Sequence, residues 1–460
     1  MGYIIPVLRE KFKDSKIIVL HIDDKTQSAE NQASSTPNIS ILHGTETQTV
    51  QKFLEKEIFS IDASLIRIIE WRPSLQFYGD TCLKLLSLVV EFIKQMDAEK
   101  RTVSAFGRRW IKNFFKNLTN VNHPLLYRQT DIPVIITGSG PSLETALPLI
   151  KKMQDKCLIL AASSSVMALL RGGINADLII ATDGGSWALR HIVPFFRAAS
   201  TAVKDCAAAK SCAAAEGCAF AVNLSAALPS QCGNTPHLLL NDGSFWQSVI
   251  LHELGLPSVI IPQRGTVTAT AIELALVLTT GNIYLAGMDL CVRDIRSHVR
   301  PYGFDYIFTE RASRFTPVYS QYFFRSGKIQ SGGTLGIYAA WFKSQLTSYP
   351  QRIYSLGTAS YGSKSNRINS AFAGFPEITD TTVLSGLNTT KKKSGIFTAS
   401  DSDFTPVLYR KRGRDALINA VNRGEFADNL KAELVPLLFP GEKNITEKQL
   451  ELAIREVSFE

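Results

Sequence analysis

The sequence lacks the features that mark secreted, disulfide-bonded and membrane-spanning proteins. Its seven cysteines are dispersed singly with no Cys-x-x-Cys pair, which predicts neither a disulfide framework nor a cysteine zinc site. The segment that begins Met1-Gly-Tyr-Ile-Ile-Pro6 has no basic stretch followed by an apolar one, and no apolar run reaches the ~18 residues that a membrane helix needs. We therefore expect a cytoplasmic protein with reduced thiols and no membrane insertion.

Motifs of nucleic-acid recognition are also missing. The sequence contains no helix-turn-helix, zinc-finger or ribonucleoprotein motif, and its basic runs do not exceed three residues, as at Lys391-Lys-Lys393. We expect no nucleic-acid partner. The formal net charge of +9 suits an anionic ligand such as a sugar nucleotide, although an ordinary basic cytosolic protein has the same balance.

The chain is too long for one ordinary hydrophobic core. It has 460 residues, of which 45% are hydrophobic and 20% charged, and this is globular composition. We predict an N-terminal α+β cap domain over residues 1–125, a central α/β domain over 126–378, and a linker with a helical C-terminal domain over 379–460. The cap contains one clear strand, Lys16–Ile22, and helical apolar spacing from Thr81 to Leu118.

Short apolar runs alternate with helical stretches in the central part. Such strands, separated by helices, are typical of a mostly parallel sheet covered on both faces. We predict a Rossmann-like α/β fold whose ligands lie at the carboxyl ends of the strands. The expected strands are Asp131–Thr137, Cys157–Ala161, Leu178–Thr182, Ser258–Ile261 and Asn282–Ala286, with another after a helix within Ala202–Ala227.

The first candidate binding motif follows the strand that ends at Thr137. Its residues are Gly138, Ser139, Gly140, Pro141 and Ser142. Two glycines allow a sharp turn close to a ligand, and the proline and serine suit the first turn of a helix, whose free N–H groups favour phosphate. Many strand-to-helix turns have such glycines without a ligand, so both interpretations stay open. The motif lacks the ending of a P-loop and the third glycine of a dinucleotide fingerprint.

Two acidic residues follow other strands. Asp183 precedes two glycines after the strand that begins near Asp177, and Asp289 lies in Gly287-Met-Asp-Leu290. A carboxylate at the end of a parallel strand can face a ribose hydroxyl, a metal ion or a reacting group. Asp-Gly is also common in plain Asx turns, so a purely structural role is the alternative.

A third segment repeats the combination of glycine and hydroxyls at a helix start. Gly265 and Thr266 precede an apolar helix, where the threonine can also serve only as a cap. Further along, His298 lies among arginines in a polar loop, and its usual pKa suits acid–base work at neutral pH. A solvated loop histidine without a function is the alternative. Tyrosines beyond it, such as Tyr302 and Tyr306, suit either sugar and phosphate contacts or a packed lid.

Taken in order, these segments resemble the central domain of the motility-associated factor flagellin glycosyltransferases. The segments are Gly138-x-Gly-Pro-Ser-Leu143, Asn175-x-Asp177 with Asp183, Gly265-Thr-Val267, Gly287-x-Asp-Leu290 and His298, preceded by Glu70-Trp-Arg-Pro73 and Arg109-Trp-x-x-Asn113. The resemblance covers about residues 60–375. It implies a GT-A-like or Rossmann-like nucleotide-sugar domain over 126–378.

The resemblance also implies an activity, which is transfer of a pseudaminic- or legionaminic-type nonulosonic acid from its CMP-activated form to Ser or Thr of flagellin, in support of motility. Bacterial sialyltransferases have a similar turn. The implied nucleotide-binding residues are Gly138, Ser139, Gly140, Pro141, Ser142, Asp183, Gly265, Thr266 and Gly287, and the implied catalytic residues are His298 as base with Asp289 and Asp183. No cofactor is firmly implied beyond the CMP-sugar, and Mg²⁺ stays open.

Two departures and two alternatives accompany this interpretation. Thr266 stands where the family often has Ser, and Met288 stands where Gln is common, so acceptor recognition is open. Archaeal-type hydroxymethylpterin diphosphokinases share the Gly-Pro-Ser-Leu turn and would use ATP and magnesium, with the aspartates as metal ligands. A catalytically silent protein that binds nucleotide or flagellin is the third hypothesis.

Overall fold

The structure is a computed structural model of the 460-residue chain. It describes residues 4–22, 38–58, 63–202, 218–262, 264–290, 292, 295–330, 338, 342, 349–356, 377–378, 393, 395–400, 406–423, 427–442 and 444–459. Contacts divide the chain into two compact units, Met1–Ala105 and Phe106–Glu460. The three domains expected from the sequence remain a prediction.

The first unit combines a two-stranded parallel sheet with helices. Its elements are α1 (Ile4–Lys11), β1 (Ile17–His21), β2 (Ile39–His43), α2 (Thr47–Ile58), a short 3-10 helix (Ala63–Leu65) and the first part of α3 (Arg72–Leu118). The strand predicted at Lys16–Ile22 is confirmed as β1. Val50, Leu54 and Ile58 of α2 form its small core, against which Leu85 and Val89 of α3 pack. Gly79 departs from helical backbone angles, so α3 is kinked there.

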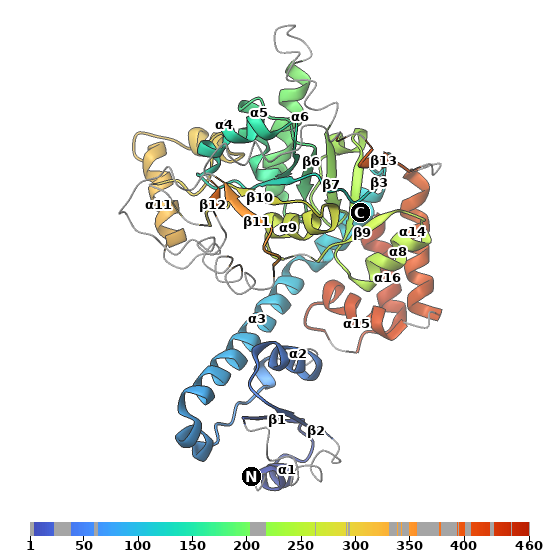
Figure 1. The fold of residues 1–460 in the computed structure, drawn as a ribbon. Coiled ribbons are helices and arrows are strands. Elements are labelled where there is room, and N and C mark those ends of the chain that lie inside the picture. The colour runs from blue at the N-terminus through green and yellow to red at the C-terminus, as the bar shows by residue number, and fades with distance from the viewer. Residues whose placement is uncertain are drawn as a thin grey trace. The chain divides into compact units, whose positions relative to one another are not determined.

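The second unit contains a nine-stranded parallel sheet (Figure 1), and this confirms the predicted α/β class. The strands are β4 (Val134–Thr137), β5 (Leu158–Ala162), β6 (Leu178–Ala181), β7 (Ala219–Asn223), β8 (His237–Asn241), β9 (Ser258–Ile260), β10 (Ile283–Ala286), β11 (Ile353–Leu356) and β12 (Glu377–Ile378). Each of the predicted strands is found. The helix expected within Ala202–Ala227 falls largely on residues outside the described ranges.

Helices connect these strands and cover the sheet. They are α4 (Leu143–Met153), α5 (Val166–Arg171), α6 (Leu189–Ala202), α8 (Phe245–Glu253), α9 (Val267–Leu278), α10 (Asp305–Glu310), α11 (Val318–Gln330), α14 (Pro406–Arg423), α15 (Ala427–Leu438) and α16 (Glu447–Phe459). An antiparallel pair, β3 (Leu125–Tyr127) and β13 (Phe397–Ala399), lies outside the main sheet. Among the described residues, no helix combines the length and apolar character needed to cross a bilayer.

The order of the strands creates a switch point between β4 and β10. The order is β12-β11-β10-β4-β5-β6-β7-β8-β9, so the chain moves from β4 to β9 in one direction and then returns to pair β10 with the other side of β4. Connections that leave two adjacent parallel strands in opposite directions open a crevice at their carboxyl ends. The candidate motifs at Gly138 and Gly287 follow these two strands.

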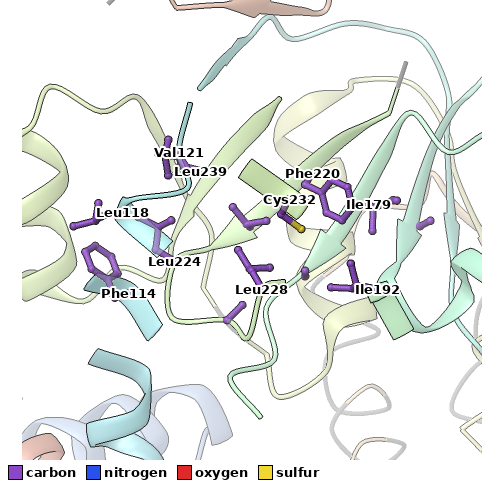
Figure 2. Close-up of a cluster of buried hydrophobic side chains, with 14 of the residues drawn as sticks. Phe114, Leu118, Val121, Ile179, Ile192, Phe220, Leu224, Leu228, Cys232 and Leu239 are labelled. Atoms are coloured by element: carbon purple, nitrogen blue, oxygen red, sulfur yellow. The ribbon is translucent and has the colours of Figure 1, made fainter. Parts of the chain in front are cut away.

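Alternate residues of each strand enter two cores on opposite faces of the sheet. On β4, Ile135 faces one core while Val134 and Ile136 face the other, as the period of two in a strand requires. Figure 2 shows part of the first core, in which Phe114 of α3 lies near Leu224. The C-terminal helices join the same core through Leu417, Val421, Leu430 and Leu434.

Candidate functional site

The glycine turn after β4 lies directly against the loop after β10. The backbone N–H of Gly138 donates to the carbonyl of Ala286 at 2.8 Å, and that of Gly140 donates to the carbonyl of Gly287 at 2.6 Å. A Cβ on Gly138 would lie 2.5 Å from the Gly287 oxygen, and one on Gly140 would lie 2.0 Å from Asp289 Oδ2. Both glycines are therefore needed for the contact between the two loops.

Asp289 reaches across this contact to the start of α4. Its Oδ2 accepts hydrogen bonds from the backbone N–H and from the hydroxyl of Ser142, each at 2.9 Å. A helix N-terminus attracts an anion because its first N–H groups have no partner within the helix. The chain thus supplies its own carboxylate where the sequence suggested a phosphate, and a phosphate at this position would have to displace Asp289.

Three hydrogen bonds hold the loop that carries His298 against the glycine turn and the start of α4. The N–H of Val299 donates to the carbonyl of Ser139 at 2.8 Å. Glu144, in the first turn of α4, accepts from the Arg296 guanidinium at 2.8 Å and from the Arg300 N–H at 3.0 Å. The structure therefore brings the glycine turn together with two segments that lie far from it in the sequence, the Gly287–Asp289 loop and the His298 loop.

His298 is packed rather than solvated, which corrects the expectation of a histidine in a polar loop with its usual pKa. Its ring stacks on Tyr302 with centroids 4.0 Å apart, and its Nδ1 lies 2.7 Å from Ser297 Oγ. Burial, together with the positive charge of Arg325 and with His191, lowers the pKa of His298 to about 3. The imidazole is therefore neutral at pH 7 and can accept a proton, but in this environment it is a weak base.

A second histidine that the sequence analysis missed, His191 of α6, lies close to the first. Its ring centroid is 4.9 Å from that of Tyr302 and 5.1 Å from that of Phe304. Burial and the nearby Arg325 lower the pKa of His191 to about 4, and its Nδ1 makes no hydrogen bond to the described residues. No motif marks this histidine in the sequence.

Asp183 follows β6 at the same edge of the sheet and is exposed. Its Oδ1 accepts from the N–H of Gly185 at 2.7 Å, so the Asx turn considered from the sequence is present. Burial raises the pKa of Tyr302 to about 12 and also raises that of Tyr338, and in both cases the Asp183 charge adds to the effect. The carboxylate therefore lies within electrostatic reach of two phenols.

The start of α9 adds the Gly265 segment to this edge. Gly265 has a φ of +75°, and a Cβ there would lie 3.6 Å from the Tyr338 ring. Thr266 is the N-cap of the helix, where its side chain accepts from the N–H of Ala269 at 3.0 Å. Tyr338 therefore links the surroundings of Gly265 with those of Asp183.

The end of α3 explains the Arg109-Trp-x-x-Asn113 motif. The Asn113 side-chain amide donates to the carbonyls of Gly184 and Ser225 at 3.1 and 3.0 Å, and so it ties the loop after β6 to the loop after β7. Trp110 packs on Gly184, where a Cβ would lie 2.4 Å from the indole. The motif thus positions the Asp183 loop.

A buried polar network at the ends of β7 and β8 was not found from the sequence. The Gln247 amide donates to Asp242 Oδ2 at 2.8 Å and to Ser225 Oγ at 3.3 Å, and its carbonyl oxygen accepts from Asn223 at 3.3 Å. The available signal was an asparagine at the end of each strand, Asn223 and Asn241, at the edge that binds ligands in such folds.

Asp177 belongs to the opposite edge. It precedes β6, and its Oδ2 accepts from the N–H of Ile159 at 2.7 Å and from the Lys393 ammonium at 2.8 Å. Asp177 of the Asn175-x-Asp177 motif therefore holds the sheet together away from the candidate site. Within the described ranges, no group of three or more His, Cys, Asp and Glu side chains could hold a metal ion.

The family comparison covers the segment that carries this geometry. Residues 108–294 match a family model described as 6-hydroxymethylpterin diphosphokinase MptE-like. This part of the chain is similar to the MptE-like family. The match confirms the expected resemblance to the hydroxymethylpterin diphosphokinase-like group.

Similar proteins and structures extend this result to the fold. Two uncharacterized proteins of Treponema pallidum (strain Nichols) are 28% identical to the chain, one over 240 residues (51% of the chain and 48% of the relative) and the other over 130 residues (27% and 62%). The chain thus spans about half the length of the first relative. The structure of the MAf glycosyltransferase from Magnetospirillum magneticum AMB-1 is also similar, with a TM-score of 0.51 and 13% sequence identity. The match covers 100% of this chain and 72% of the MAf glycosyltransferase chain, so the two share a fold.

Proposed function

We propose that the chain is a glycosyltransferase that moves a nonulosonic acid of pseudaminic or legionaminic type from its CMP-activated form to Ser or Thr of flagellin. The observation that carries the proposal is the meeting of the Gly138–Ser142 turn, the Gly287–Asp289 loop and the His298 loop at the switch point of a parallel sheet. This is where doubly wound folds bind nucleotides. The fold shared with a MAf glycosyltransferase supports the same function.

The proposed roles follow from the accessibility and charge of each group. Asp183 is exposed at the carboxyl edge and is the group best placed to bind a ribose or acceptor hydroxyl. His298 is neutral at pH 7, because its pKa is lowered to about 3, and it can take the proton that the acceptor hydroxyl loses. An anionic donor bound nearby would raise this pKa and so strengthen the base. Asp289 holds the glycine turn through Ser142 and positions the nucleotide-binding loop.

A second candidate function, pyrophosphate transfer from ATP to a hydroxymethylpterin, is favoured by the family model that matches residues 108–294. It requires that carboxylates such as Asp183 and Asp289 hold Mg²⁺ between the phosphates. One of these, Asp289, already uses Oδ2 for two hydrogen bonds from Ser142, so this oxygen would have to give them up to bind a metal ion. We prefer the first proposal because a MAf glycosyltransferase shares its fold with the whole of this chain, whereas the diphosphokinase-like match covers residues 108–294.

The nucleotide preference distinguishes the two enzymes. A ligand that binds the folded state raises the melting temperature, so CMP, CDP, ADP and ATP are compared by thermal shift, each with and without Mg²⁺. A shift selective for CMP supports the glycosyltransferase. A shift selective for ATP with Mg²⁺ rejects it in favour of the diphosphokinase.

Two variants then test the residue roles. Asp183→Asn removes an exposed charge at the site and should reduce the CMP shift, whereas Asp155→Asn, at an exposed aspartate in the turn after α4, should not. His298→Gln should retain the CMP shift but abolish sugar transfer to recombinant flagellin. Equal transfer by His298→Gln and wild type would remove the histidine from the mechanism, and CMP binding without transfer by wild type would indicate a silent binding protein.

A further inference from the structure

An open groove between α6 and α10 lies outside the candidate catalytic residues. Its volume is about 670 Å³, and its lining includes Trp187, Arg190, Val193, Arg197 and Glu310. On α6 and the short helix before it, the lining positions recur every three to four residues, so one continuous face of the helix forms a wall. Glu310 contributes to the opposite wall from α10.

One end of this groove adjoins the candidate catalytic site. The Trp187 ring lies 5.6 Å from that of Phe304, which lies 5.5 Å from Tyr302, and Tyr302 stacks on His298 at 4.0 Å. On the backbone, Trp187 comes four residues after Asp183. A long ligand in the groove would therefore present one end to the residues proposed to act on the acceptor hydroxyl.

The length of the groove indicates a polypeptide rather than a sugar. Trp187 and Arg197 are ten residues apart along a largely helical segment, which corresponds to roughly 15 Å. An extended chain covers this distance with about five residues. A single sugar ring spans only a small part of it.

The chemistry of the lining is also typical of peptide recognition. Apolar side chains such as Val193 contribute to the lining, and Trp187 is 55% exposed. Tryptophan and arginine are the residues most enriched among those that dominate the energy of protein interfaces. Arg190 and Arg197 lie two helical turns apart and outnumber Glu310, so the groove favours a segment with a negative charge.

We propose that this groove binds an extended, acidic segment of the acceptor polypeptide and places a hydroxyl of that segment at the Trp187 end, next to Asp183 and His298. The inference rests on the proposed function, because the groove has this role only if the acceptor is a protein. It assigns to α6 and α10 the recognition of the acceptor, which is separate from the binding of the nucleotide.

The test measures the affinity of recombinant, unglycosylated flagellin and the CMP thermal shift on the same full-length variants. Trp187→Ala removes the aromatic anchor, and Arg197→Glu reverses a charge at the other end of the groove. Each should weaken flagellin binding about tenfold or more, as for other dominant interface residues, and leave the CMP shift unchanged. Arg412→Glu makes the same charge change at an exposed position of α14 and should alter neither quantity.

The possible outcomes separate this inference from the proposed function. Wild-type affinity in both groove variants would overturn the inference, and so would a wild type that binds CMP but not flagellin. A wild type that binds neither would reject both proposals. Flagellin binding that is weakened by Trp187→Ala, in a protein that binds no nucleotide, would support the groove and reject the glycosyltransferase. If Arg197→Glu lowered the melting temperature by itself, the Trp187→Ala result would decide.

Discussion

The carboxylate of Asp289 accepts two hydrogen bonds from Ser142, one from the backbone and one from the hydroxyl, across a separation of 147 residues in the sequence. The two hydrogen bonds lie at the start of α4. They connect the loop that follows β4 to the loop that follows β10, its neighbour in the sheet. We therefore expect the contact between Ser142 and Asp289 to contribute both to the stability of the domain and to the shape of the candidate site.

A double-mutant cycle measures this contact. Asp289→Ala should lower the free energy of unfolding by about 1–2 kcal/mol, as the loss of a helix cap does, and Ser142→Ala by about 1 kcal/mol, as the loss of one hydrogen bond does. Because both remove the hydrogen bond from the Ser142 hydroxyl to Asp289, the double variant should cost about 1 kcal/mol less than the sum of the two, measured by urea denaturation. Asp155→Ala, at an exposed site, is the control. Strict additivity would show that the two side chains do not interact.

Gly140 should tolerate no side chain. In Gly140→Ala the new Cβ would lie 2.0 Å from Asp289 Oδ2 and 2.7 Å from the Gly287 carbonyl, so the two loops must separate. We expect a loss of about 2 kcal/mol or more in the free energy of unfolding and a weaker CMP thermal shift. Gly327→Ala is the matched control, because nothing lies within 4 Å of a Cβ there and alanine favours a helix by up to about 1 kcal/mol. Equal stability of the two variants would contradict the close contact.

The two packed histidines should make the protein less stable in acid. Their pKa values in the folded state, about 3 for His298 and about 4 for His191, lie below the ordinary value near 6.5, so the unfolded chain binds more protons between these limits. Stability from this source is complete above about pH 6.5 and decreases as the pH falls toward the folded-state values.

Removal of one histidine should reduce this dependence. The decrease in the free energy of unfolding between pH 7 and pH 5 should be about 2 kcal/mol smaller in His298→Gln than in wild type, as measured by denaturation at both values. His252→Gln, at an exposed histidine of α8, should follow the wild-type decrease. An identical decrease in all three proteins would mean that His298 titrates normally.

Asn113 should be important for the order of the loops that follow β6 and β7. Asn113→Ala leaves the carbonyls of Gly184 and Ser225 without their amide donor, and we expect a loss of about 1–3 kcal/mol in the free energy of unfolding. Amide hydrogen exchange should also increase in the segment around Asp183. Lys116→Ala, at an exposed position one turn further along α3, should change neither quantity.

Composition and pattern were sufficient to predict most of the parallel sheet but not all of it. The run Val134–Thr137 was recognisable because it is continuously apolar, rich in branched residues and ends at Gly138. His237–Asn241 was not expected as a strand, because its three leucines favour a helix equally well. Pairing with β7 and β9 determines its conformation, and such pairing is not visible locally.

In the candidate site, too, features that depend on one segment could be predicted, whereas contacts between segments could not. The order of Gly138, Asp183 and Gly287 along a parallel sheet predicted that they would meet at one edge. The hydrogen bonds from Ser142 to Asp289 and the packing of His298 depend on how two loops fit together, and neither follows from spacing within one segment.

The separation of 147 residues between Ser142 and Asp289 also has a consequence for synthesis of the chain on the ribosome. Translation at about 5–20 residues per second leaves the start of α4 without its carboxylate for about 7–30 s after Ser142 has been made. During this time β4 also lacks β10 as a neighbour. A nascent chain that stops before residue 289 can therefore contain the whole glycine motif and still lack the contacts that shape it, so this motif becomes functional only late in biosynthesis.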